Sequence, residues 1–358
     1  MNANHRFNQT TQLFRAIGLI ALIGISTASL AARPTIIKLA TVAPKGSIYH
    51  RVMQDIGEAW RKAQGGDARF IIYTDGSQGT ESETVRRLRV GQLQASMLTV
   101  AGLMEIEPSV TALQFMPATF RNWDEVDYVL DNIGADIEQK FEQKGYKILL
   151  WGMGGWVQFF SVKPRMTPEE FKDAKIFTWA GTKGQKKLMI SMGFNPVVLD
   201  LPDLLPALQT GMVDVVPVAP MWALTGQFYR YAPHMLQMNW VPIVGATVLS
   251  MKTWNAMRPE ARAAMLSAAA EAEETLRQHR AKLDGNAIGV MQERGLSVSG
   301  PDPAARQEWD QLVRSVWPRI RGSMVPEDTF DRVHELLARY RADQWPNLNW
   351  RLHWTKRH

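Results

Sequence analysis

The feature that most constrains the fold is the regular alternation of short apolar runs with amphipathic segments over residues 36–100. The apolar runs have the length of buried strands, and the segments between them place apolar residues on one face of a helix. The predicted strands are 36–40, 70–73 and 93–100, and the predicted helices begin at Ser47 and span 81–90. Because parallel strands need a crossover helix, this order predicts an α/β domain with parallel pairing.

The same alternation returns after residue 148 and predicts a second α/β unit. Residues 152–155 are rich in glycine and are expected to form a flexible crossing between the units. Thr167 and Glu170 form a capping box that predicts a helix start. Further strands are expected at 148–151, 174–179, 196–199 and 213–218, and further helices after 122 and at 184–192, 204–209, 303–317 and 328–340.

Residues 258–294 differ from the rest, because they are rich in Ala, Glu, Arg and Gln over a long stretch. At 1.5 Å per residue they predict a helix on the order of 50 Å long, which exceeds one small α/β domain. We therefore expect this helix to run along both units. The expected division is domain I at 34–152 plus 240–255, domain II at 153–239, the spanning helix at 256–295, C-terminal helices packing on the domains at 296–342, and an unassigned tail at 343–358.

The N-terminus has the organisation of a secretory signal peptide over residues 1–31. Arg6 and Arg15 precede an apolar run at 16–30, and small residues flank the end of that run. An uncleaved membrane anchor is the alternative, but the run is shorter than the ~20 residues that a membrane span needs. The expectation is export to the periplasm.

Composition and motifs exclude several classes of function. The chain has no cysteine, which rules out disulfides and thiol chemistry. Its seven histidines are scattered, so no metal site is expected. Basic and acidic residues are interleaved despite a net charge of +6, which argues against nucleic-acid binding. Gly181 and Gly184 lack the spacing of a phosphate loop, and no nucleophile–base set is visible. We expect neither an enzyme nor a cofactor.

Two segments carry a resemblance to a known family. Residues 168–177 read P-E-E-F-K-D-A-K-I-F, and residues 201–214 read L-P-D-L-L-P-A-L-Q-T-G-M-V-D. They resemble the P-x-D-L-K-G-L-K-I-R and E-x-x-x-A-L-Q-x-G-x-V-D-G segments of the solute receptors of TRAP transporters, the DctP family. The resemblance covers roughly residues 36–320. It implies a periplasmic binding protein-like fold, in which two α/β domains hold a ligand in a central cleft that closes by a hinge motion.

The chain departs from that family at several positions, and two of them concern arginines that bind the ligand. The resemblance implies an arginine that grips the ligand carboxylate where this sequence has Phe177, and a second arginine where it has Val157. Large apolar side chains are expected at the cleft instead. The expected ligand-binding residues are Lys45, Ser47, Gln78, Thr99, Trp156, Phe177, Trp179, Pro220, Trp222 and Trp240. For each tryptophan the alternative is a place in the core, and for Lys45 and Ser47 it is simple capping of a helix.

These departures lead to two functional hypotheses. The first is a TRAP receptor that binds a mainly apolar organic acid or lipid-like small molecule and delivers it to the permease subunits. The second is a periplasmic interaction module that works with a helical-repeat partner protein. An enzyme on the same scaffold is disfavoured.

Overall fold

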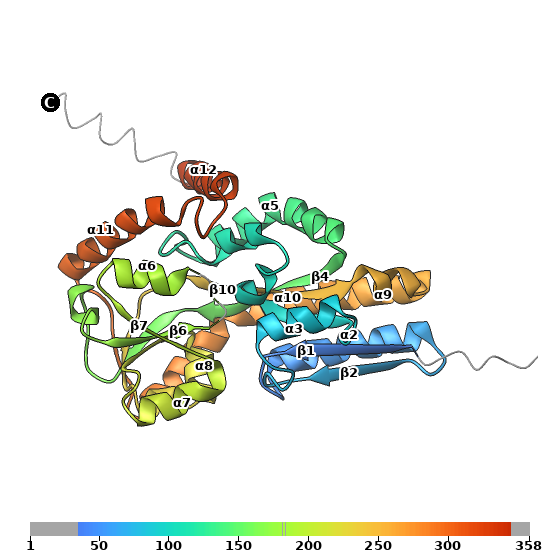
Figure 1. Cartoon of the computed structure of the whole chain (residues 1–358), viewed down its shortest axis with the longest axis horizontal. Helices are drawn as coiled ribbons and strands as arrows, with labels where there is room; N and C mark the ends of the chain where they lie inside the picture. Colours follow the sequence, from blue (N-terminus) through green and yellow to red (C-terminus); the bar gives the residue numbers. More distant parts are fainter. Residues whose placement is uncertain (1–34, 181, 183, 345–358) are drawn as a thin grey trace, which may run out of the picture.

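The computed structural model describes residues 35–180, 182 and 184–344 (Figure 1). The expected signal peptide at 1–31 and the tail from residue 345 onward lie outside the described residues. Within the described part of the chain, no helix combines the length and apolar character needed to cross a membrane.

The first of two sheets has five strands in the order β2-β1-β3-β10-β4. β1 pairs in parallel with β2 and β3, which confirms the pairing expected from the first hundred residues. β10 lies antiparallel between β3 and β4 and returns to this sheet from far along the chain. The bounds are β1 (Ile36–Thr41), β2 (Arg69–Tyr73), β3 (Ala95–Thr99), β4 (Tyr146–Trp156) and β10 (Pro242–Ser250).

The second sheet has six strands in the order β11-β9-β5-β8-β6-β7. β6 is parallel to β7 and β8, whereas β5 is antiparallel to β8 and β9. The bounds are β5 (Gln158–Ser161), β6 (Lys175–Trp179), β7 (Asn195–Leu199), β8 (Val215–Val218), β9 (His234–Leu236) and β11 (Ser297–Ser299). The two sheets confirm the expected α/β fold with two units.

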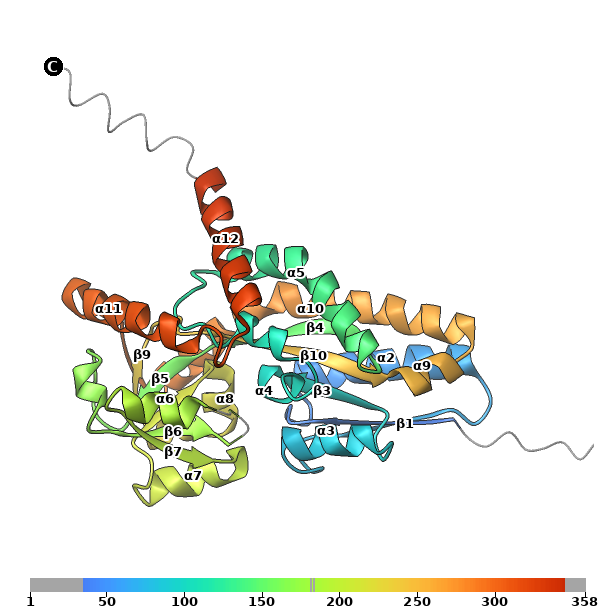
Figure 2. The same cartoon turned by 45° about the horizontal axis from the view of Figure 1, so that its top comes forward.

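Helices cover both sheets, and the longest of them links the two units (Figure 2). Helix α10 has 34 residues and packs against α2 and β4 of the first unit and against α8 of the second. The α-helices are α2 (Ile48–Gln64), α3 (Glu81–Arg89), α4 (Val100–Leu103), α5 (Trp123–Gln143), α6 (Gln185–Ser191), α7 (Leu201–Gln209), α8 (Pro220–Thr225), α9 (Met251–Ala256), α10 (Pro259–Gln292), α11 (Pro303–Ile320) and α12 (Glu327–Gln344), and the 3₁₀ turns are η1 (Pro108–Leu113), η2 (Glu169–Phe171) and η3 (Phe228–Arg230).

Two local predictions were wrong. The glycine-rich residues 152–155 are not a loop but part of the 11-residue strand β4, because β10 pairs with β4 along this stretch, from Gly245 opposite Gly152 to Pro242 opposite Trp156. The helix expected after Thr167 is a single 3₁₀ turn. Glu170 does accept a hydrogen bond from the Thr167 amide at 3.1 Å, but β6 begins too soon after it for a longer helix.

Candidate functional site

An apolar cavity of about 230 Å³ lies where the two units meet. Its wall combines Thr99 at the end of β3, the segment after η1, the start of β5, strands β6 and β8, helix α6, the crossing before β10 and one face of α11. No charged residue is among the described residues that line it. A second, smaller cavity of about 50 Å³ shares Thr99, Trp222 and Ile243 with it and extends toward β1.

Aromatic rings form one end of the apolar cavity. Phe159 stacks on Trp309 with ring centroids 5.5 Å apart, and Trp240 meets Trp309 edge-on at 5.5 Å. Phe171 completes the group, 5.2 Å from Phe159. Offset and edge-on aromatic pairs are rigid and present their faces to an apolar guest, so this end of the cavity is preorganised.

Five of the ten residues expected at the ligand line this cavity. They are Thr99, Phe177, Trp179, Trp222 and Trp240. Val157, the second position at which the family resemblance implies an arginine, also lies in the wall. Phe177 is 4% exposed and lies 5.9 Å, between ring centroids, from Trp179. The structure therefore brings together the two positions at which this chain lacks the arginines that the family resemblance implies.

The other five expected residues lie away from the apolar cavity. Ser47 caps α2, accepting a hydrogen bond from the His50 amide, and Lys45 is exposed on the preceding turn. Gln78 lines two separate hollows near β1 and α3. Trp156 packs 4.9 Å from Trp123, and Pro220 is buried in the first turn of α8. The position of Ser47 reflects capping, and those of Trp156 and Pro220 reflect core packing.

Several lining residues had no sequence signal that marked them as ligand-facing. Phe159 and Phe171 lie in short apolar segments that are typical of core. Trp309 and Val316 belong to the apolar face of α11, whose helical spacing predicts burial but does not say against what. Only the packing of α11 beside α6 turns that face into a cavity wall (Figure 1).

The polar side chains that line the cavity are uncharged, and besides the tryptophans they are Thr99, Gln114, Thr178, Thr182 and Gln185. The Trp222 Nε1 is buried and has no hydrogen-bond partner among the described residues, although Trp222 lines the cavity. The Thr99 hydroxyl donates to Glu81 Oε2 at 2.6 Å and accepts from the Ala101 amide at 3.2 Å, which leaves one lone pair able to accept a further hydrogen bond. Burial raises the pKa of Glu81, which lies behind Thr99. Trp222 and Thr99 thus offer one unpartnered indole donor and one hydroxyl acceptor.

The buried carboxylate of Asp284 connects helix α10 to β4 and α8 through hydrogen bonds. Asp284 of α10 accepts a hydrogen bond from the Trp156 amide of β4 at 3.0 Å, and it also accepts one from the Met221 amide of α8. Burial raises the pKa of Asp284 from 3.8 to about 6. Asp284 therefore links the strand that crosses between the units to the long helix and to the second unit.

The raised pKa of Asp284 predicts a pH-dependent contribution to stability. The folded protein binds this proton more tightly than the unfolded chain, so the contribution is full below pH 3.8 and is lost as the pH rises through 6. The full span is roughly 3 kcal/mol, of which about 2 kcal/mol falls between pH 4.5 and 7.5. Urea unfolding of the wild type and of Asp284→Asn at several pH values isolates this proton, because all other groups are common to both. A constant difference across this range would contradict the assignment.

The fold and the site are those of a two-domain solute-binding protein. It has two α/β units joined by crossing strands, a long helix that runs along both units, and a cavity between them. The chain belongs to the DctP family, the bacterial extracellular solute-binding proteins, family 7, whose model matches residues 39–322. Members of this family are binding proteins and not enzymes, and neither is this chain an enzyme. The resemblance to TRAP receptors is thereby confirmed.

Solved and curated relatives agree with this assignment. A TRAP periplasmic solute-binding protein from Haemophilus influenzae with bound L-gulonate is 21% identical, with a TM-score of 0.76, and the match covers 84% of this chain and 98% of that chain. The 2,3-diketo-L-gulonate-binding periplasmic protein YiaO of Escherichia coli is 22% identical over 79% of this chain and 86% of its own length. The C4-dicarboxylate-binding periplasmic protein DctP of Rhodobacter capsulatus is 21% identical over 83% of this chain and 91% of its own length. These relatives are named for their solutes, and they lend no support to a helical-repeat partner.

Proposed function

We propose that this chain is the periplasmic receptor of a TRAP-type transporter and that it binds a mainly apolar organic acid or lipid-like molecule in the apolar cavity. The observation that carries the proposal is the absence of any charged residue among the described residues lining that cavity. The receptor would deliver its ligand to the membrane permease. The named periplasmic relatives and the signal-like N-terminus support a periplasmic location.

The relatives' names point to a different ligand chemistry. L-gulonate and 2,3-diketo-L-gulonate carry one carboxylate and several further oxygen-bearing groups, and C4-dicarboxylates carry two carboxylates. A buried carboxylate needs a cation or several hydrogen-bond donors, since its desolvation costs several kcal/mol. Phe177 and Val157 offer neither, and both line the cavity. The wall therefore favours burial of apolar surface over ion pairing.

Trp222 and Thr99 are the groups at which we place the polar end of such a ligand. The unpartnered Trp222 Nε1 would donate to a ligand oxygen, and filling this buried donor would recover the free energy lost by leaving it unpaired. Thr99, in the wall shared with the smaller cavity, would accept a hydrogen bond. The aromatic cluster at Trp309 would receive the apolar end.

The test is the identity of the molecule that this protein retains. Protein purified from its native host or from a bacterial periplasm is examined by native mass spectrometry, then denatured and extracted. We expect an apolar compound with at most one acidic group. Recovery of a tightly bound sugar acid or C4-dicarboxylate would overturn the apolar-ligand proposal but leave the receptor role intact.

A neutral fluorescent probe gives a second test of the same cavity. N-phenyl-1-naphthylamine should bind the delipidated protein with a strong rise in emission, because it carries no charge and buries two aromatic groups. Succinate and gulonate should not compete with it. Competition by these acids at low concentration would place a carboxylate site in the cavity and contradict the proposal.

A further inference from the structure

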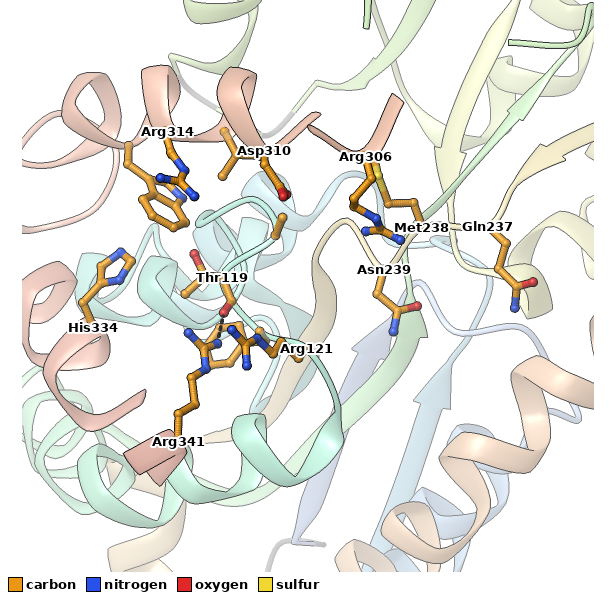
Figure 3. Close-up of a pocket in the computed structure, with 14 residues that line it drawn as sticks. Thr119, Arg121, Gln237, Met238, Asn239, Arg306, Asp310, Arg314, His334 and Arg341 are labelled. Carbon is orange, nitrogen blue, oxygen red and sulfur yellow. Dashed lines mark hydrogen bonds between the residues drawn. The ribbon is translucent and has the colours of Figure 1, made fainter. Parts of the chain in front are cut away.

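Another cavity, of about 580 Å³, opens between the two C-terminal helices and the rest of the molecule. Four arginines line it and reach it from three parts of the chain (Figure 3). Arg121 lies on the segment before α5, Arg306 and Arg314 lie on α11, and Arg341 lies near the end of α12. Residues more than 200 positions apart thus bring guanidinium groups to one space.

Most of this positive charge is not neutralised. Arg341 pairs with Glu125 at 2.7 Å. Among the described residues, the side chains of Arg121, Arg306 and Arg314 have neither a carboxylate within 4 Å nor a hydrogen-bond partner. Asp310 is the sole carboxylate among the residues that line the cavity, and it makes no ion pair within 4 Å even with the arginines four positions away on either side. The cavity therefore holds a surplus of cations.

The wall of this cavity is held by hydrogen bonds from several elements. Ala118 has φ of +48°, a conformation that costs a non-glycine residue on the order of 1 kcal/mol or more. Its amide donates to the Trp240 carbonyl at 2.7 Å, and Trp317 Nε1 donates to the Pro117 carbonyl at 3.1 Å. Arg341 donates to the Thr119 carbonyl at 2.7 Å (Figure 3). A strained backbone conformation at Ala118, held by hydrogen bonds from several elements, indicates that this wall has a fixed conformation.

One buried polar atom at this cavity lacks a partner. His334 lies between Trp317 and Phe330, with ring centroids 4.7 Å from each. Its Nε2 is buried and makes no hydrogen bond to any described residue. Burial and the nearby Arg341 lower the pKa of His334, so its imidazole is neutral at pH 7. A neutral imidazole keeps one nitrogen able to donate to a ligand oxygen.

We propose that this arginine cavity is a second binding site, distinct from the apolar cavity, for a small oxyanion that carries two or more negative charges. Guanidinium groups recognise carboxylate and phosphate oxygens through paired hydrogen bonds, so polycarboxylates and phosphates share the required chemistry. The arginines lie around one hollow that is open to solvent (Figure 3). A small ion with several oxygens can contact more than one of them at once.

The two cavities share a wall. Pro117 and Trp240 line the apolar cavity, while the adjoining Ala118 and Asn239 line the arginine cavity. Helix α11 likewise contributes to both cavities. A bound oxyanion would therefore lie directly behind the wall of the apolar cavity.

The test is titration calorimetry of the whole protein at low ionic strength with citrate and, separately, with inorganic phosphate. Three of the arginines are exposed, so we expect a dissociation constant on the order of 0.1–1 mM for the better anion. Acetate at the same ionic strength should not bind. Arg306→Gln combined with Arg314→Gln should weaken binding at least tenfold, and Arg121→Gln should weaken it by a smaller factor. The better of citrate and phosphate identifies the class of ligand.

The control matched to Arg121→Gln is Arg332→Gln, which removes one positive charge from an exposed site on α12 outside the cavity. It should bind the anion as the wild type does. The proposal is overturned if neither anion binds below 10 mM, if the control variant loses as much affinity as the double variant, or if only polyanions such as heparin bind. Circular dichroism of each variant verifies that it is folded.

Discussion

Replacing Phe177 by arginine is expected to reduce binding of the neutral probe by at least 100-fold and to lower the free energy of unfolding by about 3–5 kcal/mol. Phe177 is 4% exposed, and no described residue lining the apolar cavity carries a negative charge. The guanidinium would therefore be buried without a partner. Probe fluorescence and urea unfolding measure the two effects.

Two control variants separate the added charge from other effects. Phe177→Leu keeps the site apolar and should cost only about 1 kcal/mol of stability, with modest loss of probe binding. Val198→Arg places the same charge on the neighbouring strand β7, where the side chain is 37% exposed, and should have little effect on either measurement. If Phe177→Arg were tolerated as well as Val198→Arg, the apolar interpretation of the cavity would be wrong.

Replacing Gly155 by alanine is expected to destabilise the protein by about 3 kcal/mol or more. Gly155 has φ of +99°, which L side chains rarely adopt, and a Cβ there would lie 2.6 Å from Asp284 Oδ1 and 2.9 Å from the Ala219 Cβ. Asp284 cannot move away freely, because it accepts hydrogen bonds from two backbone amides. The clash would displace the crossing strand next to Val157, so probe binding should fall together with stability.

Gly91→Ala is the matched control for this variant. Gly91 also has positive φ, at +75°, but nothing lies within 4 Å of the position that a Cβ would occupy there. Its replacement should lower the free energy of unfolding by only about 1–2 kcal/mol, the cost of positive φ in a residue with a Cβ, and leave probe binding unchanged. Equal losses in the two variants would show that contact with Asp284 and Ala219 contributes nothing. Urea unfolding at pH 7 distinguishes these outcomes.

Local pattern predicted most of the secondary structure, because periodicity and capping act within one segment. The spacing of apolar residues along each segment predicted the 258–294 helix and the parallel pairing of the first strands. Strand β10 was missed as a partner of β3 and β4 because its pairing joins segments far apart in the chain. The glycines of β4 were misassigned for the same reason.

The candidate site was predictable only in part. Phe177 could be assigned to the cavity because a family segment fixes its place on β6, and the structure does place it in the wall. Trp156 is also a large aromatic residue and was expected at the ligand. It packs against Trp123, away from the cavity. An apolar side chain gives the same sequence signal whether it faces the core or a ligand, so tertiary packing decides between them.

The sequence by itself determined the two α/β units, the long helix that spans them, the family and the loss of the implied arginines at Phe177 and Val157. Only the tertiary structure decided which apolar residues enclose a cavity and that Arg121, Arg306, Arg314 and Arg341 converge on another. Local periodicity depends on neighbours a few residues away, whereas a cavity is the space left where distant elements pack.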